Sequence, residues 1–431
     1  MATPYDLFVI GGGINGVGIA RDAAGRGLKV CLADMDGLGA ATSSASTKLL
    51  HGGLRYLEFF EFGMVRHALA ERETLLRIMP HIAWPLRFVL PLSRDMRFDA
   101  TTPASRLLSG IMPWMRGRRP AWMIRMGLFL YDHLGGRRIL PGTRRLRLTR
   151  AAAGAPLQDR FARAYEYSDC WVDDSRLVIL NARDAADRGA RILPRAKVTQ
   201  AERRDDLWHI TVETDNGPMV FVAKTLVNAA GPWAADILRT VVRRNATAAL
   251  RLVRGSHILT KKLYDHDQCY TLQGADGRVV FVIPYETDFT LIGTTDVDHD
   301  GDVRDAVCTP EERDYLLRCV NAYFAKTLTE KDVLWTFSGV RPLYDDGATS
   351  ATAATRDYVL ELEAGDGPAV LTVFGGKITT YRKLAEDALK KLAPHVATMA
   401  PPWTATVPLP GGDFAVDAVD AQIRDLQRGY P

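Results

Sequence analysis

The sequence contains few cysteines, and they form no pattern. The 431 residues include five cysteines, widely scattered and without a Cys-x-x-Cys pair. An odd number at such spacing excludes a disulfide framework and offers no metal-ligand motif. We therefore predict no metal site and a protein that resides in a reducing compartment.

Long apolar runs are missing as well. No stretch of about eighteen apolar residues occurs, so we predict no helix that crosses a bilayer. Residues 1–6 lack the basic and apolar regions of a signal peptide, which predicts a protein that is not exported.

The net charge is small, but it is unevenly distributed. A formal charge of +4, without a recognised nucleic-acid-binding module, argues against nucleic acid as a partner. Residues 104–150 nevertheless hold eleven arginines and a single acid, Asp132, together with Trp114 and Trp122. Tryptophan and arginine together favour the lipid headgroup boundary, which predicts peripheral contact with a membrane surface. The alternative is a basic surface helix packed on its own domain.

The N-terminus follows the pattern of a dinucleotide-binding unit. A short apolar run, predicted to be a buried strand, leads through Gly11, Gly13 and Gly16 into a predicted helix, and the next predicted strand ends at Asp34. These glycines permit a tight turn and let a pyrophosphate approach the helix N-terminus. The acid at that position accepts hydrogen bonds from a ribose.

The predicted elements change in type along the chain. Strands that alternate apolar and polar residues lie within a frame of parallel α/β type, which predicts a mixed fold. The predictions are strands over 5–10, 29–33, 225–231 and 370–374, an antiparallel hairpin over 207–220, alternating strands over 278–294, and helices over 15–26, 381–392 and 415–428.

Residues 40–53 indicate which dinucleotide is bound. Ten of these fourteen residues are alanine, glycine, serine or threonine. Small side chains and hydroxyls let the backbone lie along an extended diphosphate–ribityl chain, which FAD presents and NAD does not. FAD is therefore the predicted cofactor, and a flexible surface linker is the alternative interpretation.

Several segments resemble, in order over nearly the whole chain, the FAD-dependent, quinone-linked glycerol-3-phosphate dehydrogenase family. The most specific are ATSSASTKLLHGGLRYLE (41–58), EYSDCWVDDSRLV (166–178), VNAAGPW (227–233) and FGGKITTYRKLAE (374–386). The resemblance implies an α/β fold in which a glutathione-reductase-like Rossmann FAD-binding domain is interleaved with a D-amino-acid-oxidase-like antiparallel-sheet substrate domain.

The domain organisation implied by this resemblance is interrupted along the chain. The segment from about 92 to 119 is longer than usual in the family, and the final residues correspond to the start of a further helical domain. We expect an FAD-binding domain in three segments (1–75, 181–240, 346–400), substrate-domain segments (76–180, the first and membrane-facing one, and 241–345), and a C-terminal helical stub (401–431).

The resemblance also implies an activity. It predicts oxidation of sn-glycerol 3-phosphate to dihydroxyacetone phosphate, with electrons passed to a membrane quinone at the cytoplasmic face. An oxidase that uses oxygen, an amine or amino-acid oxidase of the same fold, and a non-catalytic FAD-containing membrane-surface protein remain alternatives. The oligomeric state is open, with a homodimer as one expectation.

The substrate chemistry selects candidate residues. A phosphate dianion favours arginine, whose planar fork binds oxyanions bidentately. The family-like segments offer Arg55, Tyr56, Arg341, Arg356 and Lys377. Arg341 and Lys377 are also predicted to act in catalysis.

The general base is assigned to a histidine. Histidine titrates near neutral pH, so His257 is the first choice for taking the hydroxyl proton. His51 is the rival, although its glycine neighbours suggest that it packs against the flavin.

The motifs and the resemblance together predict the cofactor-binding residues. Val198 is expected to meet the adenine through its backbone, and Lys377 lies at a helix N-terminus suited to negative charge. The predicted contacts with FAD are Gly11, Gly13, Ile14, Asn15, Gly16, Asp34, Thr42, Ser43, Ser44, Ser46, Thr47, Lys48, Leu49, His51, Gly53, Val198, Ala230, Gly231, Trp233, Gly376, Lys377, Ile378 and Thr379.

Overall fold

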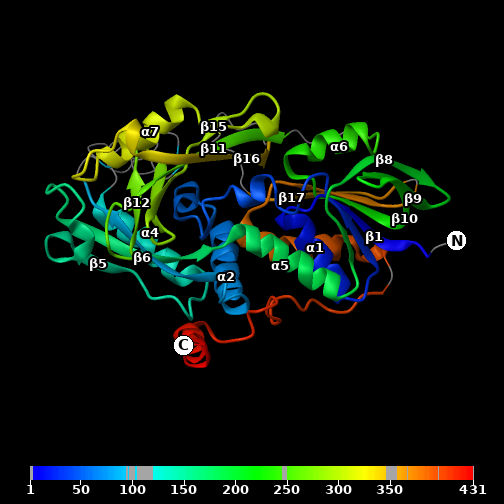
Figure 1. Cartoon of the computed structure of the whole chain (residues 1–431), viewed down its shortest axis with the longest axis horizontal. Coiled ribbons are helices and arrows are strands. Elements are labelled where there is room, and N and C mark those ends of the chain that lie inside the picture. The colour runs from blue at the N-terminus through cyan, green and yellow to red at the C-terminus, as the bar shows by residue number, and fades with distance from the viewer. Residues whose placement is uncertain are drawn as a thin grey trace.

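The computed structural model describes residues 3–93, 96, 102–103, 120–244, 250–345, 357–365, 367–396 and 398–430. Within this part of the chain two sheets form two lobes, which lie along the long axis of the molecule (Figure 1). Helix α2 (Phe62–Ile78) lies between the lobes and contacts elements of both.

The first sheet has a parallel centre. Strand β1 pairs in parallel with β10 and β2, and the order β17-β18-β10-β1-β2-β7 continues outward, with β8 and β9 attached through β10. Its strands in the described residues are β1 (Tyr5–Ile10), β2 (Val30–Ala33), β7 (Arg191–Leu193), β8 (Ala196–Arg204), β9 (Leu207–Thr214), β10 (Gly217–Asn228), β17 (Val359–Glu363) and β18 (Val370–Phe374).

Strand β10 corrects one prediction. The hairpin over 207–220 and a separate strand over 225–231 were expected, but β10 runs without interruption from Gly217 to Asn228. Its first half pairs antiparallel with β9 and its second half pairs in parallel with β1 and β18. The alternating half has an exposed face, whereas the apolar half is enclosed within the sheet, so the hydrophobic period changes within one strand.

Helix α1 (Ile14–Gly25) follows β1 through the glycine turn. A Cβ atom at Gly16 would lie 1.9 Å from the carbonyl oxygen of Gly11, so the turn requires glycine at Gly16. Gly11 itself has φ +105°, a conformation that favours glycine. Helix α1 packs against two other helices, α5 (Asp174–Asp187) and α8 (Tyr381–Leu392).

The second sheet is mainly antiparallel. Its long pair is β11 with β16, and β4 joins β6 to β12. The strands in the described residues are β3 (Leu49–Leu50), β4 (Ala83–Pro91), β5 (Arg144–Arg147), β6 (Arg163–Val172), β11 (Leu250–Lys261), β12 (Cys269–Gln273), β13 (Val279–Tyr285), β14 (Phe289–Gly293), β15 (Val297–Asp298) and β16 (Val333–Tyr344).

The strands of the two sheets come from different segments of the chain. All strands of the first sheet lie within 1–75, 181–240 and 346–400. The second sheet uses 76–180 and 241–345, and β3 is the exception because it leaves the first segment to pair with β6. The chain therefore passes between the two sheets at β3, immediately before His51.

In the described part of the chain, the remaining helices lie on the outside of the sheets. They are α4 (Ala121–Leu134), α6 (Ala234–Thr240), α7 (Pro310–Asn321) and α9 (Val419–Gly429). The helix expected over 415–428 is shorter, because the chain forms a separate 3₁₀ turn at Val416–Ala418 before α9 begins. None of the residues of α9 is buried.

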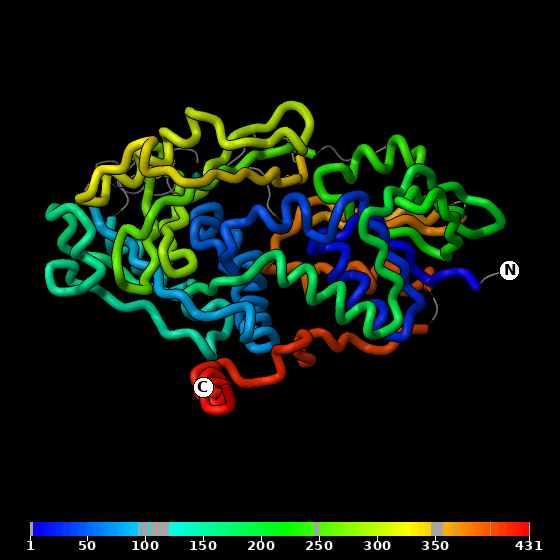
Figure 2. Tube along the Cα trace, viewed as in Figure 1, coloured from blue at the N-terminus to red at the C-terminus, as the bar shows by residue number. Residues whose placement is uncertain are grey.

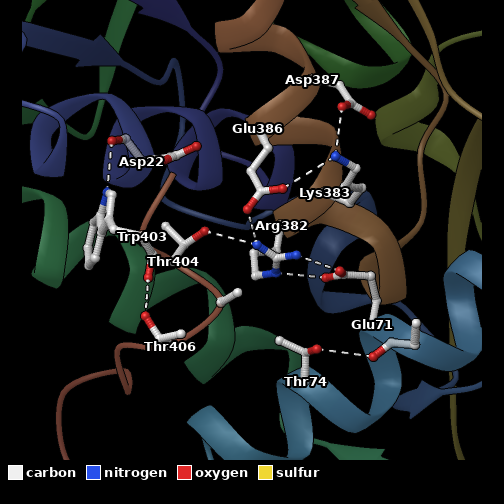
Figure 3. Close-up of polar contacts among 12 residues, drawn as sticks. Asp22, Glu71, Thr74, Arg382, Lys383, Glu386, Asp387, Trp403, Thr404 and Thr406 are labelled. Carbon is white, nitrogen blue, oxygen red and sulfur yellow. Dashed lines mark hydrogen bonds and ion pairs between the residues drawn. The ribbon is translucent and has the colours of Figure 1, made fainter. Parts of the chain in front are cut away.

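The segment after α8 runs along the outside of the molecule to α9 (Figure 2). Several hydrogen bonds hold it to the body. Among them, Trp403 Nε1 donates to the carbonyl oxygen of Asp22 at 3.1 Å, and Arg382 Nη1 donates to Thr404 Oγ1 at 3.2 Å (Figure 3). Leu409 is buried in the core of the first lobe. This segment therefore fixes the outer end of α1 and the start of α8.

Candidate functional site

A cavity of about 630 Å³ lies where the two sheets meet. It is formed by the β1–α1 turn, the segment 42–58, the ends of β10 and β18, helix α4 and strands of the second sheet. The predicted cofactor residues that line it are Gly13, Ile14, Asn15, Thr42, Ser43, Ser46, Thr47, Leu49, His51, Gly53, Gly231, Gly376, Lys377 and Ile378.

The other predicted cofactor residues do not line the cavity. Thr379, in the 3₁₀ turn η9 (Ile378–Thr380), accepts a hydrogen bond from the His51 backbone N–H at 3.3 Å. Val198 is buried in the core of the first lobe. The residues of this group are Gly11, Gly16, Asp34, Ser44, Lys48, Val198, Ala230, Trp233 and Thr379.

The start of α1 presents backbone donors to the cavity. No side chain of its own caps the helix, and its first turn carries no acid. The Ile14 N–H donates to Ser43 Oγ at 3.0 Å, so a residue of the predicted FAD segment reaches this helix end. Unpaired N–H groups at a helix N-terminus favour a phosphate.

Asp34 supports the same turn from the end of β2. Its carboxylate accepts hydrogen bonds from the backbone N–H of Gly12 at 2.6 Å and of Asp36 at 3.0 Å. Burial raises the pKa of Asp34, and the two backbone donors act in the opposite direction. The carboxylate thus fixes the glycine turn through hydrogen bonds that involve both of its oxygens.

One buried polar atom supports the presence of a ligand. Asn15 Nδ2 donates to the Gly375 carbonyl oxygen at 3.1 Å, while Asn15 Oδ1 is buried without a hydrogen-bond partner in the described part of the chain. Buried polar atoms are nearly always satisfied, so a donor of a bound molecule is expected there. A Cβ at Gly376 would lie 2.8 Å from Asn15 Nδ2, so there is no room for a side chain at Gly376 beside Asn15. These features fit FAD.

Three cationic side chains face the same cavity. Arg55, Arg341 and Lys377 all line it, together with Tyr56. The Lys377 ammonium lies 4.1 Å from the centre of the Tyr56 ring and 3.1 Å from Met64 Sδ. Because the residues come from three distant segments, the fold itself collects this positive charge.

The Arg341 guanidinium is held by the residues that directly follow strand β14. Its Nη1 donates to Asp296 Oδ1 at 2.6 Å and to the Thr295 carbonyl oxygen at 3.3 Å, and its Nη2 donates to Thr294 Oγ1 at 3.0 Å. Asp296 and Thr294 also line the cavity. The sequence reasoning did not assign them a role.

The two candidate bases are in different environments. His51 lines the cavity. His257 is 1% exposed and does not line the cavity; its Nε2 lies 2.9 Å from Thr47 Oγ1 and its ring stacks on Phe337. Burial lowers the pKa of His257 to about 3, with Arg341 and Lys48 acting in the same direction. Of these two candidates, only His51 lines the cavity.

Lys48, another predicted cofactor residue, is paired with an acid. It forms an ion pair with the buried Asp174 at 2.5 Å and does not line the cavity. Arg356 lies outside the described residues, as do Trp114 and the arginines at 116, 118 and 119. Sequence reasoning also assigned no role to Tyr167 and Asp169 of β6, which line the cavity.

Comparison with known proteins decides the family. The family model described as "FAD dependent oxidoreductase" matches residues 6–382. The chain is 49% identical to the glycerol-3-phosphate dehydrogenase of Pseudomonas aeruginosa, over 100% of this chain and 79% of that protein. The chain belongs to the FAD-dependent glycerol-3-phosphate dehydrogenase family. Its cofactor is FAD, and its fold is the expected interleaved α/β fold.

Two other members illustrate the breadth of this family. The D-erythritol 1-phosphate dehydrogenase of Brucella abortus is also 49% identical, over 100% of this chain and 82% of that protein. The FAD complex of the Bacillus halodurans glycerol-3-phosphate dehydrogenase superposes with a TM-score of 0.72 at 27% identity, covering 99% of this chain and 72% of that chain.

The glycine turn gives a prediction about cofactor binding. A Cβ at Gly13 would meet only Ser43 Oγ, at 3.2 Å, and the φ of Gly13 is −74°, so the fold tolerates a side chain there. Gly13→Val should therefore leave the protein folded but remove FAD, because the side chain occupies the approach of the pyrophosphate to α1. Visible absorbance and far-UV circular dichroism of the purified variant measure the two effects. A fully yellow variant would contradict the placement of the pyrophosphate.

Proposed function

We propose that this protein oxidises sn-glycerol 3-phosphate to dihydroxyacetone phosphate and passes the electrons to a membrane quinone. One observation carries the proposal: Arg55, Arg341 and Lys377 converge with His51 on the cavity that the FAD segments line. Arg55 and Lys377, together with Arg341 beside Asp296, offer more cationic donors than a single carboxylate needs, which favours a phosphate dianion over an amino acid.

Different residues act on the phosphate and on the alcohol of the substrate. The arginine forks and the Lys377 ammonium bind the phosphate and orient the alcohol. His51 takes the proton of the hydroxyl group that is attached to the carbon being oxidised. When bound, FAD supplies the acceptor for the hydride.

A second phosphorylated alcohol is a candidate for the same site. The relative from Brucella abortus is named for D-erythritol 1-phosphate and is as similar as the relative from Pseudomonas aeruginosa. Both compounds carry a phosphate and hydroxyls, so the same cations suit both. A side-by-side comparison of kcat/KM for the two substrates assigns the preference.

Anaerobic titration tests the proposed reaction. Glycerol 3-phosphate should bleach the flavin absorbance of the purified protein, and a quinone should restore it. An unbleached spectrum would refute the reaction. Fast reoxidation by air, without quinone, would instead support an oxidase, and bleaching by amino acids alone would support an amino-acid oxidase.

Exposed apolar side chains support the membrane-linked acceptor. Trp122 and Met126 of α4 are 52% and 50% exposed and also line the cavity, as do Phe62 at the start of α2 and Phe60 just before it. The cavity therefore opens between apolar side chains, a suitable entrance for a hydrophobic quinone. No helix within the described ranges is long and apolar enough to cross a membrane. We place this surface on the cytoplasmic face of the bilayer as a peripheral contact.

Vesicle binding tests this surface. Trp122→Ser combined with Phe129→Ser should weaken binding to anionic vesicles by roughly tenfold or more, because each half-exposed ring loses its burial among the lipids. High salt should weaken wild-type binding only in part, since it screens the arginines but not the apolar contact.

Trp335→Ser is the matched control for the vesicle measurement. Trp335 is 67% exposed on β16 and does not line the cavity. Equal binding by the wild type, the α4 variant and the control would exclude α4 as the membrane contact.

A further inference from the structure

The backbone of Gly52 is enclosed by two helices. A Cβ on Gly52 would lie 2.4 Å from Leu69 Cδ2 of α2 and 2.8 Å from Tyr131 Cε2 of α4. The Gly52 N–H donates to the Tyr131 hydroxyl at 2.6 Å. The segment that carries His51 into the cavity is therefore fixed at its next residue by α4.

Tyr131 is oriented in turn by a buried ion pair. Its hydroxyl donates to Asp169 Oδ1 at 2.7 Å, and Arg72 Nη1 donates to the same oxygen at 2.6 Å. All three side chains are buried. The ion pair with Arg72 at 2.6 Å favours the ionised carboxylate of Asp169, whereas burial acts against it and raises the pKa of Asp169 to about 6.

The ionised carboxylate of Asp169 determines which group donates and which accepts in each of these hydrogen bonds. An ionised carboxylate only accepts hydrogen bonds, so the single O–H of Tyr131 must point to Asp169. The lone pairs of the same oxygen then face Gly52 and accept its N–H. A tyrosine without this partner could rotate its proton toward the amide and lose the contact.

Glu71, the residue before Arg72 in α2, contacts helix α8 instead. Glu71 accepts hydrogen bonds from Arg382 of α8 at 2.5 and 2.8 Å (Figure 3). Helix α8 follows η9, whose Thr379 accepts the His51 N–H. The amides of two successive residues, His51 and Gly52, are thus fixed from two sides, and both sides are anchored on α2.

We propose that Tyr131, oriented by Asp169 and Arg72, is a positioning residue that determines where the His51 imidazole stands in the cavity. The inference rests on the proposed function, in which His51 takes the substrate proton. Tyr131 itself does not line the cavity, so it acts only through the segment that it holds.

The variant Tyr131→Phe tests the proposal in the FAD-loaded protein. It keeps the ring and removes the hydroxyl, so flavin reduction at saturating glycerol 3-phosphate should slow by roughly 10- to 100-fold, as expected for a misplaced reacting group. The substrate concentration at half-maximal rate should change less than threefold, because the cations remain. The matched control is Tyr165→Phe, which removes a buried hydroxyl that donates to Ala121 of the same helix at 3.2 Å.

Hydrogen exchange gives a readout that needs no turnover. Peptides covering residues 49–54 should exchange faster in Tyr131→Phe, and in Asp169→Asn, than in wild type, and Tyr165→Phe should match wild type. Unchanged exchange, or equal losses of rate in Tyr131→Phe and Tyr165→Phe, would overturn the proposal. Wild-type flavin that glycerol 3-phosphate does not bleach would refute the proposed function instead, whatever the exchange result.

Discussion

Replacing His51 with glutamine is expected to slow reduction of the flavin by glycerol 3-phosphate by about 10²- to 10⁴-fold, the usual contribution of a positioned general base. Glutamine keeps a polar side chain of similar length but cannot take the hydroxyl proton. His51 lines the cavity that Arg55 and Lys377 also line. Anaerobic stopped-flow absorbance at saturating substrate measures the rate, and the ratio of flavin to protein absorbance shows that FAD is retained.

His257→Gln is the matched control for this measurement. Glutamine can preserve the contact with Thr47, and the position lies behind the cavity wall, so a change of less than about tenfold is expected in flavin reduction. The reverse pattern, with a slow His257 variant and a fast His51 variant, would return the base to His257.

The fold could be predicted where the hydrophobic period was uniform. The strand over 370–374 and the helix over 381–392 have the predicted bounds. β10 was divided in two because its pattern changes from alternating to fully apolar where the strand enters the centre of the sheet. The spacing of apolar residues along a strand depends on whether one face or both faces of the strand are buried. A strand that is half-buried in one part and fully buried in another is therefore predicted as two elements.

The sequence was sufficient to predict which segments form the site, but not which side chains contact each other within it. Gly13, Ser43 and Lys377 come from separate motifs, and the cavity brings all three together. The contact between Asp296 and Arg341, and the one between Tyr131 and Gly52, join residues 45 and 79 positions apart. Such pairs depend on how the two sheets meet, which no local pattern contains.

His257 shows how the environment of a residue bears on a role predicted from its type. It was the first choice because histidine titrates near neutral pH, and the residue lies on β11, between β14 and β16. A strand paired on both sides places alternate side chains against the sheet faces, and this one is enclosed by Phe337. Burial then removes the near-neutral pKa on which the assignment depended.

Arg341→Ala is expected to lower kcat/KM for glycerol 3-phosphate by about 10- to 100-fold. A charge-assisted hydrogen bond contributes about 1.5–3 kcal/mol, and truncation also leaves part of the phosphate charge unpaired. Arg341→Lys should recover only part of the loss, because the ammonium keeps the charge but not the planar fork. Steady-state kinetics with a quinone acceptor measure all three proteins.

The ion pair with Asp296 requires one further variant, because alanine at Arg341 also leaves that carboxylate without its partner at 2.6 Å. The cavity would then hold an additional uncompensated negative charge, which repels the phosphate by itself. The double variant Arg341→Ala with Asp296→Asn removes this charge. If Arg341 binds the phosphate, the double variant should remain at least tenfold below wild type, since the fork is still missing. Recovery to within about twofold of wild type would mean that Arg341 neutralises Asp296 and that Arg55 and Lys377 bind the substrate.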